Sequence, residues 1–264
     1  MNNAIAITEN GQDRYEEYEE LLVRRDHLYK VAGSYMTAYT REFGDLITSN
    51  FELKVECIKM KKTINYCRRR INRGLPIDTA NMSADVDKEM KDYYAQLKEM
   101  AEENECAKKA ESVSAFRLNR SKKIYRRLAK LIHPDINKKT NENEKLKELW
   151  NRITKAYQMS DADDLDDLEV LVRKQMEELG DDGFDIDFTD ISERIERVEK
   201  QINDIVTTEP YTYGEFLSDE EKTAEYKEQL KAEHDDYEQY LETLKKTLND
   251  TLSEGGATMV WKLD

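Results

Sequence analysis

Between positions 15 and 71, apolar side chains recur at alternating intervals of three and four residues. This spacing places them on one face of a helix and is typical of coiled coils. Arg25 and Asn50 interrupt the stripe, and Gly33 and Gly44 lie inside it. The pattern predicts one long helix, or two consecutive helices with a bend at a glycine. The apolar positions are Tyr15, Tyr18, Leu22, Tyr29, Ala32, Met36, Tyr39, Phe43, Leu46, Leu53, Cys57, Met60, Ile64, Cys67 and Ile71.

The stripe stops at Gly74-Leu75-Pro76-Ile77-Asp78, a composition typical of turns. A second stripe begins beyond Ser83 and Asp87, which can cap the start of a helix. The sequence therefore predicts an antiparallel helical hairpin over residues 1–112, with both stripes forming its core. The second stripe consists of Val86, Met90, Tyr93, Leu97 and Met100.

The last third of the chain repeats this pattern. One stripe ends before Glu209-Pro210, because proline disfavours a helical residue before it, and another follows a candidate cap at Ser218. We expect a second helical hairpin over residues 183–264, closed by Gly255-Gly256 and a short tail. The two stripes are Phe188, Ile191, Ile195, Val198, Ile202 and Ile205, then Tyr226, Leu230, His234, Tyr237, Leu241, Leu244, Leu248 and Leu252.

A different unit lies between the two predicted hairpins. Apolar residues of the stretch 122–132 fall on one helical face, which leaves a cationic face for solvent or a partner. Pro134 should end this helix and present His133 and Asp135 on an exposed turn. A polar loop over 137–143 precedes a second amphipathic helix, so the two helices should form a compact αα-hairpin. The acidic stretch 163–169 then opens a further helix, where carboxylates suit the N-terminal end.

These residues resemble a J-domain, the DnaJ-type module with a His-Pro-Asp tripeptide between its second and third helices. The family's second helix is matched by Ile124-Tyr125-Arg126-Arg127-Leu128-Ala129 and the tripeptide by His133-Pro134-Asp135. An aromatic residue, an isoleucine three residues later and an Ala-Tyr pair are typical of the third helix. Trp150, Ile153 and Ala156-Tyr157 match them. With Tyr125 and Leu128, these residues are the expected core of the module.

The resemblance covers roughly Phe116 to Gly180, within a module predicted over residues 113–182. The Tyr-x-x-Leu-Gly signature of the family's first helix is missing upstream of Phe116, and Ser121 stands where an aliphatic residue is common. The first helix is therefore divergent, or another segment replaces it. The sequence also lacks the Gly/Phe-rich linker and the repeated Cys-x-x-Cys-x-Gly-x-Gly zinc region, so it predicts a J-domain-like module placed in another scaffold.

The resemblance implies a function as a co-chaperone. J-domains dock on an ATP-bound 70-kDa heat-shock chaperone of the DnaK type and promote its ATP hydrolysis. By position, docking falls to the cations of the second helix and coupling to the tripeptide. We expect His133→Gln to abolish stimulation without unfolding the chain, because an exposed turn residue seldom supports the core. The docking cations are Lys123, Arg126, Arg127 and Lys130.

Charge and composition agree with a helical protein and leave two alternatives open. Charged residues make up 38% of the chain, with only 9 Gly and 3 Pro, which favours an all-α fold. The net charge is −15, yet seven basic residues and no acid lie between Arg117 and Lys130. One alternative is nucleic-acid binding by this basic helix, which the missing stacking aromatics and the adjoining acids disfavour. The other is a structural coiled-coil scaffold with a degenerate J-like segment, and coiled-coil helices could also pair into a homo-oligomer.

Other kinds of site have little support in the sequence. Cys57, Cys67 and Cys106 form no CxxC pair and are interpreted as small buried residues, which fits a reducing, cytoplasmic setting. No apolar run is long enough for a membrane helix. The acidic stretch 181–187 lacks the glycine and glutamate positions of a calcium loop. We expect no cofactor, no metal and no enzymatic activity, and a client of the flanking hairpins is left unidentified.

Overall fold

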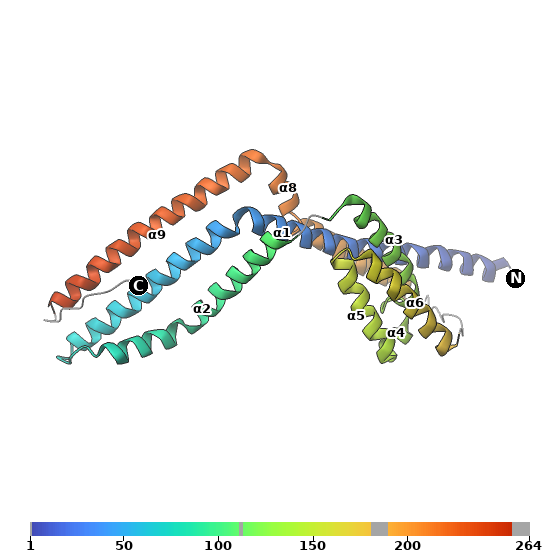
Figure 1. The fold of residues 1–264 in the computed structure, drawn as a ribbon. Coiled ribbons are helices and arrows are strands. Elements are labelled where there is room, and N and C mark those ends of the chain that lie inside the picture. The colour runs from blue at the N-terminus through green and yellow to red at the C-terminus, as the bar shows by residue number, and fades with distance from the viewer. Residues whose placement is uncertain (1, 111–112, 181–189, 255–264) are drawn as a thin grey trace. The chain divides into compact units, whose positions relative to one another are not determined.

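The computed structural model describes residues 2–110, 113–180 and 190–254, with side chains from residue 13 onward. All regular elements of this part of the chain are helices, which confirms the all-α prediction (Figure 1). The predicted acidic loop over 181–187 and the Gly255-Gly256 tail lie outside the described residues. The helices are α1 (Asn2–Ile71), α2 (Thr79–Lys109), α3 (Ala115–Ile132), α4 (Lys138–Glu142), α5 (Glu144–Gln158), α6 (Ala162–Leu179), α7 (Ile191–Thr207), α8 (Tyr213–Ser218) and α9 (Glu220–Glu254).

Helix α1 runs without a break through Gly33 and Gly44, so the one-helix interpretation of its stripe is right. The start of α2 differs from the expectation. Asp78 caps it, with its Oδ1 accepting from the backbone N–H groups of Ala80 at 3.0 Å and Asn81 at 3.1 Å. Ser83 lies inside the helix instead. Asp78 comes earlier in the chain than Ser83 and accepts from the first free N–H groups after the turn, so the helix begins there.

The start of α9 also differs. Ser218 is the last residue of α8, and the Asp219 carboxylate accepts from the backbone N–H of Lys222 at 3.1 Å. Asp219 is therefore the cap. The expected polar loop over 137–143 contains the short helix α4, whose cap is Asn137. Asparagine and aspartate are strong caps, and they decide these boundaries locally.

The chain folds into two compact units. Unit 1 contains residues 1–35 and 111–214, and unit 2 contains residues 36–110 and 215–264. The three sequential segments expected at 1–112, 113–182 and 183–264 stay a prediction, and the two compact units divide the chain differently. The physical reason is that α1 contributes to both units, and that α7 and α9 pack in different ones.

Unit 2 holds an apolar core built from the second part of α1, from α2 and from α9. The later part of the α1 stripe and the α2 stripe pack together, and the last turns of α9 join them (Figure 1). The earlier part of the α1 stripe packs on α7 instead of α2. Asn50, which interrupts the stripe, donates through Nδ2 to the Leu230 carbonyl oxygen at 2.8 Å. The buried core residues are Val55, Cys57, Ile64, Tyr66, Cys67, Met82, Val86, Met90, Leu244, Leu248 and Leu252.

Unit 1 has two apolar clusters. The larger belongs to α3, α5 and α6, which pack on one another as a small module. The smaller joins α7 to the first part of α1 through Tyr15, Tyr18 and Leu22. The partners on α7 are Ile191, Ile195, Val198 and Ile202. The α7 stripe is therefore apolar as expected, but it packs on α1.

The three cysteines differ in burial. Cys57 and Cys67 are buried, whereas Cys106 is exposed, so the expectation that all three cysteines are buried is wrong for Cys106. Position 106 lies on the solvent side of α2. In the part of the chain that the structure describes, no helix has both the length and the hydropathy to cross a membrane.

Candidate functional site

Helix α3 places its apolar residues inside the module and its cations outside. Ser114 caps it by accepting from the backbone N–H of Arg117 at 3.3 Å. Ser121, which departs from the family pattern, is fully buried and donates through Oγ to the Leu118 carbonyl oxygen at 2.9 Å. A serine is thus accommodated because it has a hydrogen-bond acceptor. The buried residues of α3 are Ser121, Ile124, Tyr125, Leu128, Ala129 and Ile132.

Helix α5 contributes the other half of the module core. Asn143 caps it, and Ile153, Ala156 and Tyr157 are buried. The rings of Tyr125 and Tyr157 stack with centroids 3.9 Å apart and planes 11° from parallel. Trp150 is partly buried and packs against the same cluster. The expected module core therefore lies together between α3 and α5.

The tripeptide forms the turn at the end of α3. The backbone N–H of His133 still bonds the Ala129 carbonyl oxygen at 2.9 Å, and the helix ends there, before Pro134, as expected. The His133 carbonyl oxygen then accepts from the N–H groups of Ile136 at 2.9 Å and Asn137 at 2.7 Å. The turn is thus held by backbone hydrogen bonds, which fix where the tripeptide side chains begin.

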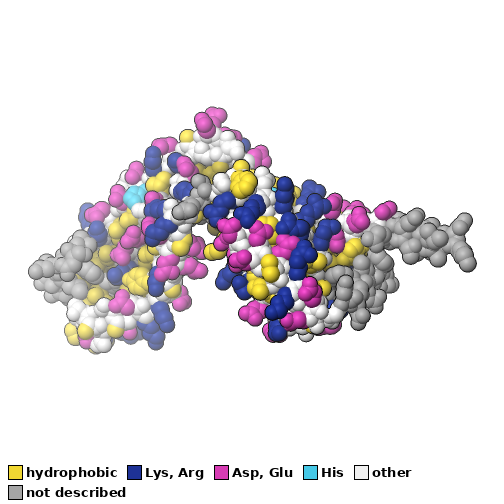
Figure 2. Space-filling view, turned by 45° about the vertical axis from the view of Figure 1, so that its right-hand side comes forward, with side chains coloured by type: hydrophobic (Ala, Val, Ile, Leu, Met, Phe, Trp, Pro, Cys, Tyr) yellow, Lys and Arg dark blue, Asp and Glu magenta, His cyan; other side chains and the backbone are white. Residues whose placement is uncertain are grey.

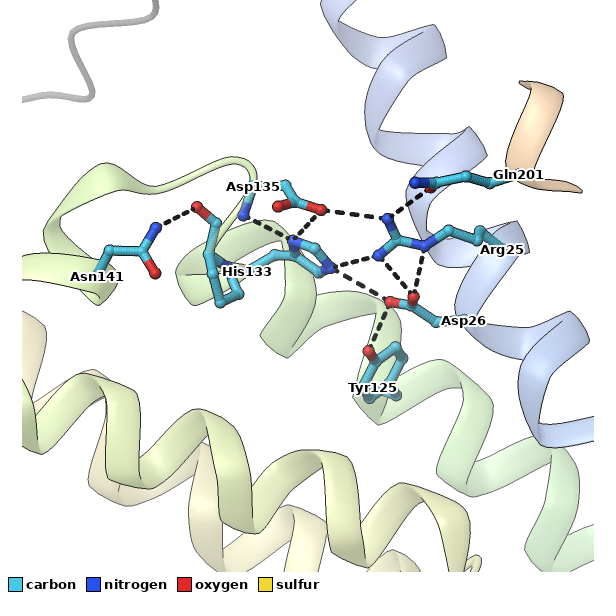
Figure 3. Close-up of polar contacts among 8 residues, drawn as sticks. Arg25, Asp26, Tyr125, His133, Asp135, Asn141 and Gln201 are labelled. Carbon is cyan, nitrogen blue, oxygen red and sulfur yellow. Dashed lines mark hydrogen bonds and ion pairs between the residues drawn. The ribbon is translucent and has the colours of Figure 1, made fainter. Parts of the chain in front are cut away.

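The expectation of an exposed His133 is wrong, because its side chain is only 4% exposed. Its Nδ1 accepts from the backbone N–H of Asp135 at 3.0 Å, so a neutral ring carries its proton on Nε2. Nε2 lies 3.3 Å from Oδ2 of Asp26, to which it can donate (Figure 3). Asp135 is exposed as expected, at 46% of its side chain.

Arg25 and Asp26 of α1 complete this cluster. The Arg25 guanidinium donates to the Asp135 carboxylate at 3.2 Å and to Oδ1 of Asp26 at 2.9 Å, and it also bonds Gln201 of α7 at 3.2 Å (Figure 3). The Tyr125 hydroxyl donates to Oδ2 of Asp26 at 2.8 Å. The sequence-based reasoning did not assign Arg25 and Asp26 to the site. The available signal was Arg25 itself, a charge at an apolar position of the stripe.

Charge and hydrogen bonding keep Asp26 ionised. Burial alone would raise its pKa, but the hydrogen bond from His133 and the positive charge of Arg25 outweigh burial and lower that pKa below its usual value. The same carboxylate contributes to a raised pKa of Tyr125, of which burial is the largest cause. The cluster thus links α1 electrostatically to the tripeptide and to α3.

The four cations expected to dock a partner are all exposed on α3, but three of them have acidic partners within unit 1. Lys130 pairs with Glu19 of α1 at 2.6 Å, and Arg126 pairs with Glu20. Arg127 pairs with Glu169 of α6 at 2.6 Å and, at 3.9 Å, with Asp166, whereas Lys123 lies exposed beside Arg127 at the edge of an open groove. Lysine, arginine and acidic side chains alternate over the surface seen in Figure 2.

A second contact between α1 and the module surrounds Tyr157. His27 Nδ1 lies 3.1 Å from the Tyr157 hydroxyl, and the Lys30 ammonium lies 4.1 Å from the centre of the Tyr157 ring. Lys30 is only 6% exposed, and burial lowers its pKa to about 8. An ammonium group that loses water on burial regains part of that attraction from the face of an aromatic ring.

Comparison with known proteins gives one partial match. Over 64 residues, 24% of its length, this chain is 45% identical to the chaperone protein DnaJ of Mycoplasma mobile. The match covers 14% of that relative. No family model and no solved structure matches the chain. The chain therefore contains a short stretch similar to DnaJ, which agrees at this level with the resemblance seen at the tripeptide.

Proposed function

We propose that this protein is a J-domain co-chaperone that docks on a 70-kDa heat-shock chaperone of the DnaK type and stimulates its ATP hydrolysis. The observation that carries the proposal is the His133-Pro134-Asp135 turn, which ends a cationic helix in a module with its own apolar core. The similarity to DnaJ supports the same function. In this role the protein performs no chemistry itself, because the partner hydrolyses the nucleotide.

The geometry suggests how each group would act. The cations of α3 would attract an acidic surface of the chaperone and raise the rate of association. The Asp135 carboxylate sits on a turn fixed by backbone hydrogen bonds, where a cationic side chain of the partner can reach it. His133, being buried, would act through the shape of that turn, since its ring accepts the Asp135 N–H. The helices of unit 2 would then recruit a client.

The test is steady-state ATP hydrolysis by a DnaK-type chaperone with this protein added. We expect the wild type to accelerate hydrolysis and Asp135→Asn to raise the concentration for half-maximal stimulation roughly ten-fold or more, as for a lost charge-assisted hydrogen bond. Asp167→Asn, at an exposed position of α6, is the matched control and should behave as the wild type.

His133→Gln is expected to abolish stimulation, but for a reason that the sequence alone did not show. Because the ring is buried, this variant should also lower the stability of the module, so its helicity and thermal midpoint are recorded by circular dichroism. Asp135→Asn, exposed and therefore little changed in stability, separates docking from folding. Equal stimulation by the wild type and Asp135→Asn would reject the assignment of the tripeptide, and no stimulation by the wild type would reject the function.

A further inference from the structure

Helix α1 covers the surface on which the chaperone would dock. Its residues contact the tripeptide and the cationic face of α3 together: Glu19 with Lys130, Glu20 with Arg126, Asp26 with His133 and Arg25 with Asp135. The pairing follows charge throughout, because carboxylates meet the cations and the arginine meets the carboxylate of the tripeptide. We infer that this segment of α1, residues 19–26, is an internal competitor that must leave before a chaperone can dock.

The competitor is built to separate from the module. Among the described residues, the buried cluster of the module takes Val23 alone from α1, and the rest comes from α3, α5 and α6. The other contacts are hydrogen bonds and ion pairs, of which that between Asp26 and His133 is nearly buried and those of Arg126 and Lys130 lie at half-exposed cations. Ion pairs at half-exposed cations contribute little each and can be exchanged for equivalent contacts with another charged surface.

Apart from Val23, the buried apolar side chains of this part of α1 pack on α7 and not on the module. Tyr15, Tyr18 and Leu22 pack on α7, and the Gln201 side chain of α7 accepts from Arg25. When α1 leaves the module together with α7, these apolar contacts persist. Release exposes the side chains of Val23 and the partly buried Ile136, and it also uncovers the Tyr157 ring beside His27 and Lys30. The larger apolar contact of α1, with α7, stays buried, which limits the free-energy cost.

Arg25 is the residue of α1 that meets the carboxylate of the tripeptide. In the proposed function, the Asp135 carboxylate receives a cationic group of the chaperone. In this structure Arg25 already occupies that carboxylate, from a nearly buried position fixed by Asp26 and Gln201. Arg25 donates to Oδ2 of that carboxylate, so a cationic group of the chaperone that needs the same oxygen atom has to displace it, and docking competes with the α1 contact. This inference rests on the proposed function.

The experiment compares the wild type with Glu19→Gln/Glu20→Gln in the chaperone ATPase assay, using the full chain. The double variant removes two ion pairs of the α1 contact and keeps the size of both side chains. The Glu20–Arg126 pair is exposed at both side chains, whereas the Glu19 side chain is 9% exposed, and two such pairs correspond to roughly a three- to ten-fold change in an equilibrium. We therefore expect half-maximal stimulation at a three- to ten-fold lower concentration.

The matched control is Glu16→Gln/Glu17→Gln, which makes the same charge change one turn earlier on the same helix. Both glutamates are exposed and have no ion pair in the part of the chain that the structure describes. This control should stay close to the wild type. If both double variants or neither of them lower the concentration, α1 is not a specific competitor and the inference is overturned. The proposed function still stands in that case, provided that Asp135→Asn loses stimulation.

A second measurement follows α1 directly. Amide hydrogen exchange of the full chain is recorded with and without the ATP-bound chaperone. Competition predicts faster exchange or altered protection within residues 15–30 together with protection of residues 123–135. Protection of residues 123–135 with residues 15–30 unchanged would show docking beside an α1 that stays in place, which overturns the inference. No protection anywhere and no stimulation would reject the proposed function itself.

Discussion

Residues 15–32 of α1 and residues 50–71 of the same helix share one apolar spacing but meet their neighbours differently. The later segment buries Val55, Cys57, Ile64 and Cys67 in the core of unit 2. The earlier segment meets the tripeptide module chiefly through charged and polar side chains and turns its apolar residues toward α7. The stripe thus packs into an apolar cluster at both ends, and only the earlier segment has a polar face beside it that meets the tripeptide module.

Shortening a buried side chain in the later segment, residues 50–71, should have the largest effect. Ile64 is 4% exposed in the core of unit 2, and Ile64→Ala should lower the free energy of unfolding of that unit by about 3 kcal/mol because it leaves a cavity. Amide hydrogen exchange should accelerate in α2 and α9. The reciprocal variant Leu128→Ala should accelerate exchange in α3, α5 and α6 instead. Equal acceleration of all these helices by either variant would mean that the two units unfold together.

Replacing Asn50, the polar residue that interrupts the stripe at the start of the later segment, should have an intermediate effect. Asn50 is 4% exposed, donates to the Leu230 carbonyl oxygen, and has its Oδ1 3.0 Å from Nδ1 of His234. Asn50→Leu keeps a similar volume but leaves these groups without their partner, which should cost about 2 kcal/mol in chemical denaturation. Glu52→Gln, exposed on the same helix, is the control. An Asn50→Leu variant as stable as the wild type would show that the network adds no net stability.

The smallest effect is expected at Lys30, in the earlier segment of α1. Lys30→Met should raise the free energy of unfolding at pH 7 by about 1 kcal/mol, because the variant removes a charge that is costly to bury beside Tyr157. The effect should depend on pH, and thermal or urea unfolding of both proteins between pH 7 and 9.5 measures it.

The direction of this pH dependence follows from the lowered pKa of Lys30, about 8 instead of 10.5. Below pH 8 the folded and unfolded chains both carry the charge, so the full cost of burial is present. Between pH 8 and 10.5 the folded chain has lost a proton that the unfolded chain keeps, so the contribution of Lys30 to stability rises with pH. The advantage of Lys30→Met should therefore shrink above pH 8. An advantage that is constant with pH would show that packing, not charge, causes it.

Local patterns in the sequence were sufficient for the long helices and for the turn at the tripeptide, but not for the short helix α4, where a polar loop was expected. The spacing of apolar residues predicts α1, α2 and α9, and Pro134 marks the end of α3. Boundaries that depended on a choice between neighbouring caps were less certain, as at Ser83, because several residues can accept the same N–H groups.

The partners of each helix could not be predicted in the same way. The contact between Asp26 and His133 joins residues 107 positions apart, and no periodicity specifies which distant face a charged residue will meet. The burial of His133 follows from that contact and was missed with it. The stripe of α7 likewise showed an apolar face but not that its partner would be Tyr18 and Leu22 on α1.

The separation between Asp26 and His133 also affects how the chain is made. At ribosomal speeds of about 5–20 residues per second, the 107 positions from Asp26 to His133 take roughly 5–20 s to synthesise. During that interval Tyr15, Tyr18 and Leu22 have been translated but their partners on α7 have not. The nascent chain thus presents an amphipathic segment before α3 and α7, the helices that pack against it, have been made.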